Sequence, residues 1–267
     1  MSNNDPIIRT VCGDISPDQL GVCYAHEHLL GQPPSHLATD DLTLDDRQMA
    51  LAELRHFSSF GGQAVVEVTT PDYGRDAEGM RWLSEQCGVH IIAATGYNKE
   101  TFSRPFLEDE TEEALAARFV HEVIVGMDDG SVKAGLIKAS STLDAISPLA
   151  EKLFRAAAQA HHATGAPIST HTEAGTMALD QIDLLTGAGV APQHIVIGHL
   201  DRLLDWELHI RVAERGVFLG YDQAGKEKYY PDELRADFIR RLIAAGHGTQ
   251  ILLSGDLARR SYWHSYT

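Results

Sequence analysis

Two histidines separated by a single residue, His26 and His28, lie in the segment Val22-Cys23-Tyr24-Ala25-His26-Glu27-His28-Leu29-Leu30. Side chains of a β-strand alternate between its two faces, so both imidazoles would point the same way, about 7 Å apart along the strand. Two imidazoles on one face of a strand suit a metal ion. For this pair alone, two histidines satisfied by hydrogen bonds are an equally good interpretation. The residues at the ends of later strands decide between the two.

Polar residues end four later apolar segments in the same manner. Lys138 lies in Gly135-Leu136-Ile137-Lys138-Ala139, His171 follows Ile168-Ser169-Thr170, His199 follows Ile195-Val196-Ile197-Gly198, and Asp256 follows Leu252-Leu253-Ser254-Gly255. Any one of them has an ordinary explanation as a structural residue. Four histidines, one lysine and one aspartate at matching positions favour a common site.

Lys138 is the most informative of these residues, because an ammonium is costly to bury in an apolar strand. One interpretation is a buried ion pair with Asp256. The other is that burial lowers its pKa, so that the neutral amine takes up CO₂ and the resulting carbamate bridges two cations. Nitrogen and oxygen ligands of this kind suit two divalent ions, Zn²⁺ first, with Mn²⁺ or Co²⁺ as alternatives. Such a pair would lower the pKa of a bridging water and polarise a carbonyl or phosphoryl oxygen, and Asp256 would accept the proton.

Strand-like and helix-like segments alternate along the chain that carries these residues. Short apolar runs predict strands over 21–29, 63–69, 89–95, 133–139, 167–171, 194–199, 216–221 and 250–255, and helices are expected near 44–59, 76–87, 111–126, 148–163, 176–188, 203–214 and 231–245. Eight strands alternating with helices predict one (β/α)₈ TIM barrel domain over residues 1–267, with 31–43 and 98–110 as its longest loops. A doubly wound open sheet is the alternative, but no glycine-rich fingerprint follows the first strand. The chain reaches Thr267 soon after the eighth strand, so the barrel is expected to lack the helix after that strand.

Composition excludes several kinds of partner and compartment. The chain has 22 Lys and Arg against 38 Asp and Glu, a net charge of −16, which disfavours binding to nucleic acid. Three cysteines without CxxC spacing, Cys12, Cys23 and Cys87, indicate a reducing compartment. No signal peptide or membrane-spanning segment is apparent, so a cytoplasmic protein that does not contact membranes is expected.

The combined motif resembles the phosphotriesterase family of the amidohydrolase superfamily. The local sequences around these residues also resemble those of the family, in Ala25-His26-Glu27-His28, Gly135-Leu136-Ile137-Lys138, Thr170-His171-Thr172-Glu173-Ala174-Gly175 and Gly198-His199-Leu200-Asp201. The resemblance implies a binuclear metal hydrolase, usually with zinc. It implies that His26, His28 and Asp256 hold one metal, that His171 and His199 hold the other, and that N6-carboxylated Lys138 bridges them. Members of such a family often form homodimers, so a homodimer is one open arrangement.

The resemblance extends to residues that would contact a substrate. Tyr97, in Ala94-Thr95-Gly96-Tyr97, matches a tyrosine of lactonase-like members. The segments 226–232 and 256–262 are similar to a branch that hydrolyses phosphorylated sugar lactones, where a Lys, an Arg and a Tyr grip the phosphate; the matching positions are Lys228, Arg259 and Tyr262. Loops after the seventh and eighth strands are a recurrent phosphate site in barrels, and arginine offers a bidentate fork to phosphate. A solvated charged loop is the alternative for the lysines.

These observations predict an enzyme that opens a small-molecule sugar lactone, expected to be a phosphorylated aldono-lactone, by attack of a metal-bridging hydroxide. The first alternative is a hydrolase of organophosphate triesters or carboxylic esters. The alternative of another class is a degenerate barrel that binds ligands without catalysis.

Overall fold

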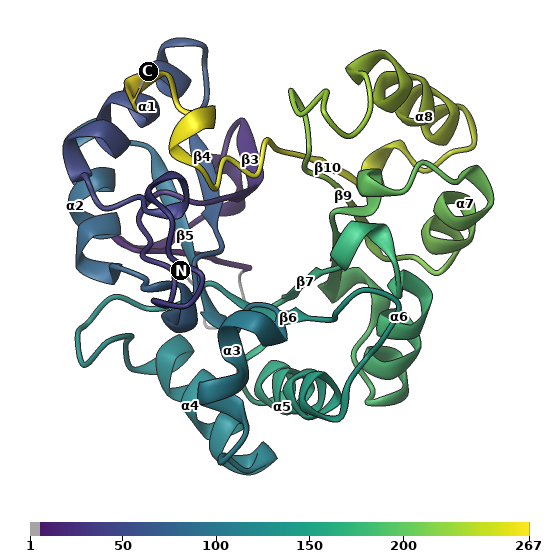
Figure 1. The fold of residues 1–267 in the computed structure, drawn as a ribbon, viewed down its shortest axis with the longest axis horizontal. Helices are drawn as coiled ribbons and strands as arrows, with labels where there is room; N and C mark the ends of the chain where they lie inside the picture. The colour runs from purple at the N-terminus through teal and green to yellow at the C-terminus, as the bar shows by residue number, and fades with distance from the viewer. Residues whose placement is uncertain (1–5, 267) are drawn as a thin grey trace.

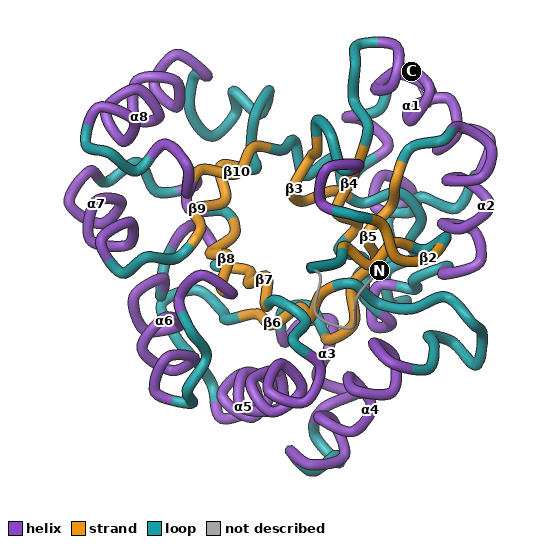
Figure 2. The backbone as a smooth tube through the Cα atoms, turned by 180° about the vertical axis from the view of Figure 1, so that it is seen from behind, coloured by secondary structure: helices purple, strands orange, loops and turns teal. Residues whose placement is uncertain are grey.

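The computed structural model describes residues 6–266, and its centre is a ring of parallel strands (Figures 1 and 2). Eight strands pair in the order in which they follow one another in the chain. They are β3 (Cys23–Glu27), β4 (Ala64–Glu67), β5 (His90–Gly96), β6 (Leu136–Ser140), β7 (Ile168–His171), β8 (Ile195–Gly198), β9 (Phe218–Tyr221) and β10 (Ile251–Leu253). All eight predicted strands are therefore confirmed, and the fold is a (β/α)₈ barrel.

Helices surround the strands as Figure 1 shows: α1 (Arg47–Ser59), α2 (Ala77–Cys87), α3 (Glu100–Leu107), α4 (Glu112–Ile124), α5 (Pro148–Thr164), α6 (Ala178–Gly187), α7 (Trp206–Glu214) and α8 (Asp232–Ala244). Side chains that accept hydrogen bonds from first-turn amides begin several of them, as Asp46 does for α1 and Ser147 for α5. Within residues 6–266, no helix combines the length and the apolar character needed to cross a membrane.

Two elements differ from the prediction. An antiparallel hairpin of β1 (Ile8–Thr10) and β2 (Gly13–Ile15) precedes the barrel, where no element was expected. The prediction of a loop over 98–110 is wrong for the residues of α3, which forms despite Pro105 in its interior. Proline lacks the amide that would bond the carbonyl of Thr101. That carbonyl instead accepts a hydrogen bond from His36 Nε2 at 2.9 Å, which removes part of the cost.

The ring is incomplete at the junction of β3 and β10, here called the seam. Strand β3 pairs only with β4, and β10 pairs only with β9. Within the described residues no α-helix follows β10, as predicted; two short 3₁₀ turns, η8 (Arg260–Tyr262) and η9 (His264–Tyr266), take its place. Figure 2 shows the ring of helices interrupted between α8 and α1.

Hydrogen bonds from the loop after β10 join the two strands at their carboxyl ends. Ser254 Oγ donates to Glu27 Oε1 at 2.6 Å, and Gly255 N donates to the same oxygen at 2.7 Å. The Asp256 amide donates to the carbonyl of His26 at 3.2 Å. The seam is thus closed by a buried carboxylate at the end of the barrel where the predicted site lies.

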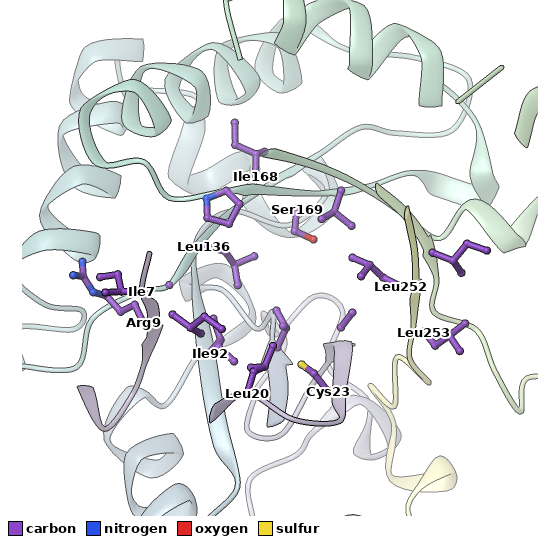
Figure 3. Close-up of a pocket in the computed structure, with 17 residues that line it drawn as sticks. Ile7, Arg9, Leu20, Cys23, Ile92, Leu136, Ile168, Ser169, Leu252 and Leu253 are labelled. Atoms are coloured by element: carbon purple, nitrogen blue, oxygen red, sulfur yellow. The ribbon is translucent and has the colours of Figure 1, made fainter. Parts of the chain in front are cut away.

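The opposite end of the barrel holds a cavity of about 510 Å³ (Figure 3). Its walls are mainly aliphatic side chains from the beginnings of the strands, among them Leu136, Ile168 and Leu252. The one charged residue of its lining, Arg9, is bound to Asp14. The polar chemistry of the barrel is therefore concentrated at the carboxyl ends of the strands.

Candidate metal centre and substrate cavity

The carboxyl ends of five barrel strands bring the six predicted metal ligands together. His28, Lys138, His171, His199 and Asp256 line one cavity of about 470 Å³, and the ring of His26 lies 4.7 Å from that of His199. His199 and Asp256 have backbone φ angles of 57° and 46°, in the left-handed region that non-glycine residues rarely adopt. Such strain is typical of functional sites, because surrounding contacts must enforce it.

His26, His28 and Asp256 form the tightest group. One ligand atom from each of the three lies within 4.8 Å of the others. Asp256 Oδ1 is 3.5 Å from His28 Nε2 and 4.0 Å from His26 Nε2. Among the described residues His26 Nε2 has no hydrogen-bond partner, although it is buried. A buried nitrogen without a partner is costly, so this atom and its neighbours fit a metal ion.

His171 and His199 lie next to this group rather than within it, with ring centroids 4.5 Å apart. His199 Nδ1 contacts Asp222 Oδ1 at 2.6 Å, which leaves Nε2 free for a metal. His171 Nε2 lies 3.4 Å from Glu173 Oε2, and Glu173 in turn binds Lys99. The two halves of the predicted binuclear set are therefore neighbours across one cavity.

The protonation states of the cluster favour metal binding. Burial lowers the pKa of His28 and of His171 to about 3, and it holds the pKa of His26 well below its usual value. Neutral imidazoles offer a lone pair to a cation. Burial opposes ionisation of Asp256, but Lys226 and His199 overcome this and hold its pKa well below the usual range. His26, His28 and His171 thus present neutral nitrogens around one carboxylate, whereas the pKa of His199 is raised because the Asp222 carboxylate outweighs the effect of burial.

Lys138 is 1% exposed, and burial lowers its pKa. Its Nζ donates to the carbonyl of Val68 at 3.2 Å. The ion pair that was its alternative role is not formed, because Asp256 pairs with Lys226 at 2.6 Å instead. Gly96 on β5 makes room for this strand, since a Cβ there would lie 2.0 Å from the Lys138 carbonyl oxygen. Among residues 6–266, no carboxylate lies within ion-pair distance of this buried amine, an arrangement that is compatible with the carbamate hypothesis.

Residues that the sequence did not single out hold the histidines in place. The carboxylate of Asp222 accepts from both the amide and the ring of His199 and lies 3.6 Å from His26 Nδ1. His28 Nδ1 contacts Thr69 Oγ1 at 2.8 Å, and that hydroxyl donates to Glu67 Oε1 at 2.5 Å. Carboxylates that orient metal-binding histidines are a general feature of metal sites.

The predicted substrate-binding residues divide into two groups. Arg259 and Tyr262 line the cavity, and Lys228 binds the Tyr262 hydroxyl from outside the lining. Arg259 is also engaged by Asp41 at 2.9 Å. Tyr97 is not among the lining residues, because its ring packs against Phe119. Its hydroxyl receives a hydrogen bond from Arg118, so Tyr97 packs against α4 and does not line the cavity.

Known proteins with similar sequences and structures agree with this site. The chain matches the phosphotriesterase family over residues 6–267. It is 33% identical over 280 residues to a phospho-furanose lactonase of Mycoplasmopsis agalactiae, covering 98% of this chain and 79% of that protein. The crystal structure of a lactonase from Listeria monocytogenes superposes with a TM-score of 0.94 at 38% identity, covering 98% of this chain and 85% of that one.

A further solved structure is a phosphotriesterase homology protein from Escherichia coli, complexed with phosphate in its active site. It has a TM-score of 0.90 and 33% identity, over 93% of this chain and 86% of that one. The barrel, the cluster of histidines, lysine and aspartate at its carboxyl end and the match over nearly the whole chain lead to one conclusion: the protein is a hydrolase of the phosphotriesterase family.

Proposed function

We propose that the protein is a metal-dependent lactonase that opens a phosphorylated sugar lactone to its hydroxy acid. The observation that carries the proposal is one cavity of about 470 Å³ that is lined both by the His/Lys/Asp cluster and by four cations, Lys99, Arg202, Lys226 and Arg259. A small ester with an anionic substituent matches these two sets of lining residues. The names of the lactonases from Listeria monocytogenes and Mycoplasmopsis agalactiae support this substrate class.

Two divalent cations, with Zn²⁺ as the first candidate, would be held by His26, His28 and Asp256 on one side and by His171 and His199 on the other. Carboxylated Lys138 would bridge them. The unpartnered His26 Nε2 and the buried Lys138 amine support this assignment. When bound, the cations would polarise the lactone carbonyl and lower the pKa of water.

The side chains around the cluster divide the remaining work. Asp256, ionised and facing His28 through Oδ1, can accept a proton, while Lys226 holds its Oδ2 and thereby fixes the plane of the carboxylate. Tyr73, whose ring lies 5.3 Å from that of His28, closes one wall of the cavity. Arg259 and Tyr262 lie at the rim, where they can contact the anionic group.

Lactone opening releases a proton, so a pH-indicator screen tests the proposal. Zinc-loaded protein would be assayed on a library of sugar lactones with and without a 5-phosphate, and on an aryl dialkyl phosphate triester. We expect the highest kcat/KM on a phosphorylated lactone, and no turnover after Lys138→Ala. A preference for the triester would favour the organophosphate hydrolase. Bound metal without turnover on any substrate would favour the non-catalytic barrel.

A further inference from the structure

Three loops at the rim of the cavity interleave cations with aromatic rings. The Cζ of Arg202 lies 3.9 Å from the ring centroid of Tyr229, and Lys228 Nζ lies 5.0 Å from the same centroid. Lys228 Nζ is also 4.9 Å from the ring centroid of Tyr262, and Lys226 Nζ lies 5.1 Å from that ring. We call these five residues the cation–aromatic stack. They come from the loops after β8, β9 and β10, so the stack adds contacts among these three loops.

The cations of this rim differ in whether an acid already neutralises them. Lys99 pairs with Glu173, Lys226 with Asp256 and Arg259 with Asp41. Within residues 6–266, Arg202 and Lys228 form no ion pair with a carboxylate. Two uncompensated cations beside one ring are unusual in a chain of net charge −16, where acids are plentiful.

Arg202 is the member of this pair that lines the cavity. It ends the turn η6 (Leu200–Arg202), which follows His199 directly, so its position is tied to that of a metal-binding residue. A guanidinium that rests its face on an aromatic ring keeps the N–H groups of its edge free to donate. Those groups match a phosphate in a bidentate manner.

We propose that Arg202 is a specificity-determining residue that binds the phosphate monoester of the substrate, with Lys228 as the second cation. This inference rests on the proposed function and refines it, because neither the sequence motifs nor the resemblance pointed to Arg202. It adds Arg202 to the role expected of Arg259, whose guanidinium also pairs with Asp41. Tyr229 holds the two cations on one ring, so the phosphate is placed between the loops after β8 and β9.

The test is the ratio of kcat/KM on a phosphorylated lactone to kcat/KM on its unphosphorylated analogue. Arg202→Gln should lower this ratio by about 10- to 150-fold, the loss expected for one hydrogen-bonded charged contact. Arg202→Lys keeps the positive charge but not the bidentate geometry of the guanidinium, so the ratio should fall less than in Arg202→Gln. Arg240→Gln, which removes an exposed arginine of α8 paired with Asp237, is the matched control and should not change the ratio. An unchanged ratio in Arg202→Gln overturns the inference and leaves the lactonase proposal standing.

A second measurement separates failure of this inference from failure of the proposed function. If no lactone is hydrolysed, calorimetric titration of the metal-loaded protein with inorganic phosphate replaces the ratio. A Kd that rises at least tenfold in Arg202→Gln, and not in Arg240→Gln, supports the anion site without a lactonase. Equal phosphate affinity in wild type and Arg202→Gln overturns it.

Discussion

At the scale of single residues, Asp222 has the widest influence on the candidate metal centre. It follows β9, is 1% exposed, and its two oxygens reach the amide and ring of His199 and the Nδ1 side of His26. These two histidines belong to different halves of the proposed binuclear set. One carboxylate thus orients a candidate ligand from each half of that set.

Replacement of Asp222 by Asn should therefore weaken metal binding. We expect a loss of about 10- to 100-fold in affinity, typical of residues that orient metal ligands. Competition between the protein and a chromogenic chelator for Zn²⁺ measures this directly, without a turnover assay. Asp183→Asn, on an exposed ion pair with Arg215, is the control. Unaltered zinc affinity in Asp222→Asn would show that the histidines keep their orientation without the Asp222 carboxylate.

Strand position predicted the residues of the metal cluster, whereas Arg259 and Tyr262 were predicted from a family resemblance. His26, His28, Lys138 and Asp256 could be found because the end of a parallel strand fixes where a side chain points. Asp222 ends Gly220-Tyr221-Asp222 in the same way, so the rule that found the others could have found it. Arg202 could not be found, because loop conformation decides which cations meet the cavity. Tyr97 illustrates the same limit: it directly follows β5, but its ring packs against Phe119 and its hydroxyl contacts Arg118, so it does not line the cavity.

At the scale of elements, the seam is the place where the barrel relies on side chains instead of strand pairing. Glu27 accepts hydrogen bonds from Ser254 and from the amides of Gly255 and Leu257, and thereby holds β3 against the loop after β10. The helical layer was predicted well because caps such as Asp46 and Ser147 are local signals. The opening between β3 and β10 could not be predicted, because strand pairing between the ends of a chain is not encoded locally.

Glu27→Gln should destabilise the metal-free protein. An amide group cannot accept from all three donors, and leaving a buried donor unpaired costs ~1–3 kcal/mol. Urea denaturation of chelator-treated protein would measure the free energy of unfolding apart from any loss of metal. The exposed Glu85 of α2 provides the matched control, Glu85→Gln, for which little change is expected. Equal urea midpoints of unfolding for Glu27→Gln and Glu85→Gln would show that the stability of the seam does not depend on Glu27.

His209 of helix α7 is another buried side chain whose effect on stability can be predicted. Its Nδ1 contacts the Tyr221 hydroxyl of β9 at 2.5 Å, and its Nε2 contacts the Leu203 carbonyl at 2.8 Å. Burial lowers its pKa, so the folded protein binds fewer protons than the unfolded chain below pH ~6.5. The stability that the neutral ring contributes is complete above that pH and is lost as the pH falls through the lowered pKa of the folded state.

We therefore expect that His209→Gln makes the free energy of unfolding less dependent on pH between 5 and 7. The largest difference in slope for one proton is about 1.4 kcal/mol per pH unit. Denaturation at several pH values measures it, and a measurement at pH 8 gives the separate cost of the lost hydrogen bonds. Parallel profiles of wild type and variant would exclude His209 as an acid-sensitive group.

At the scale of the whole molecule, the candidate metal ligands bridge the seam. His26 belongs to the first strand of the ring, His28 directly follows that strand, and Asp256 follows the last. A cation held by these three would connect β3 with β10, where no strand ladder does. A ligand that binds only the folded state at 100 times its Kd stabilises it by about 2.7 kcal/mol.

Removal of metal should accordingly loosen the seam before the rest of the barrel. We expect faster amide hydrogen exchange in β3 and β10 after chelation, with little change in β6 and β7, which pair on both sides. Exchange followed by mass spectrometry, with zinc added back as the control, measures this. Uniform acceleration in all strands would indicate that the barrel opens as one unit.

The open seam also has a consequence for the lifetime of the protein. A ring joined by coordination can be opened by competition for its metal, whereas a ring joined by strand ladders cannot. Proteases cut the chain where it opens, and Val22 and Leu253, both at least half exposed beside the seam, lie where that opening would begin. We expect that metal scarcity both abolishes the activity of this hydrolase and shortens its half-life. Metal-free molecules would then be degraded by proteases instead of accumulating.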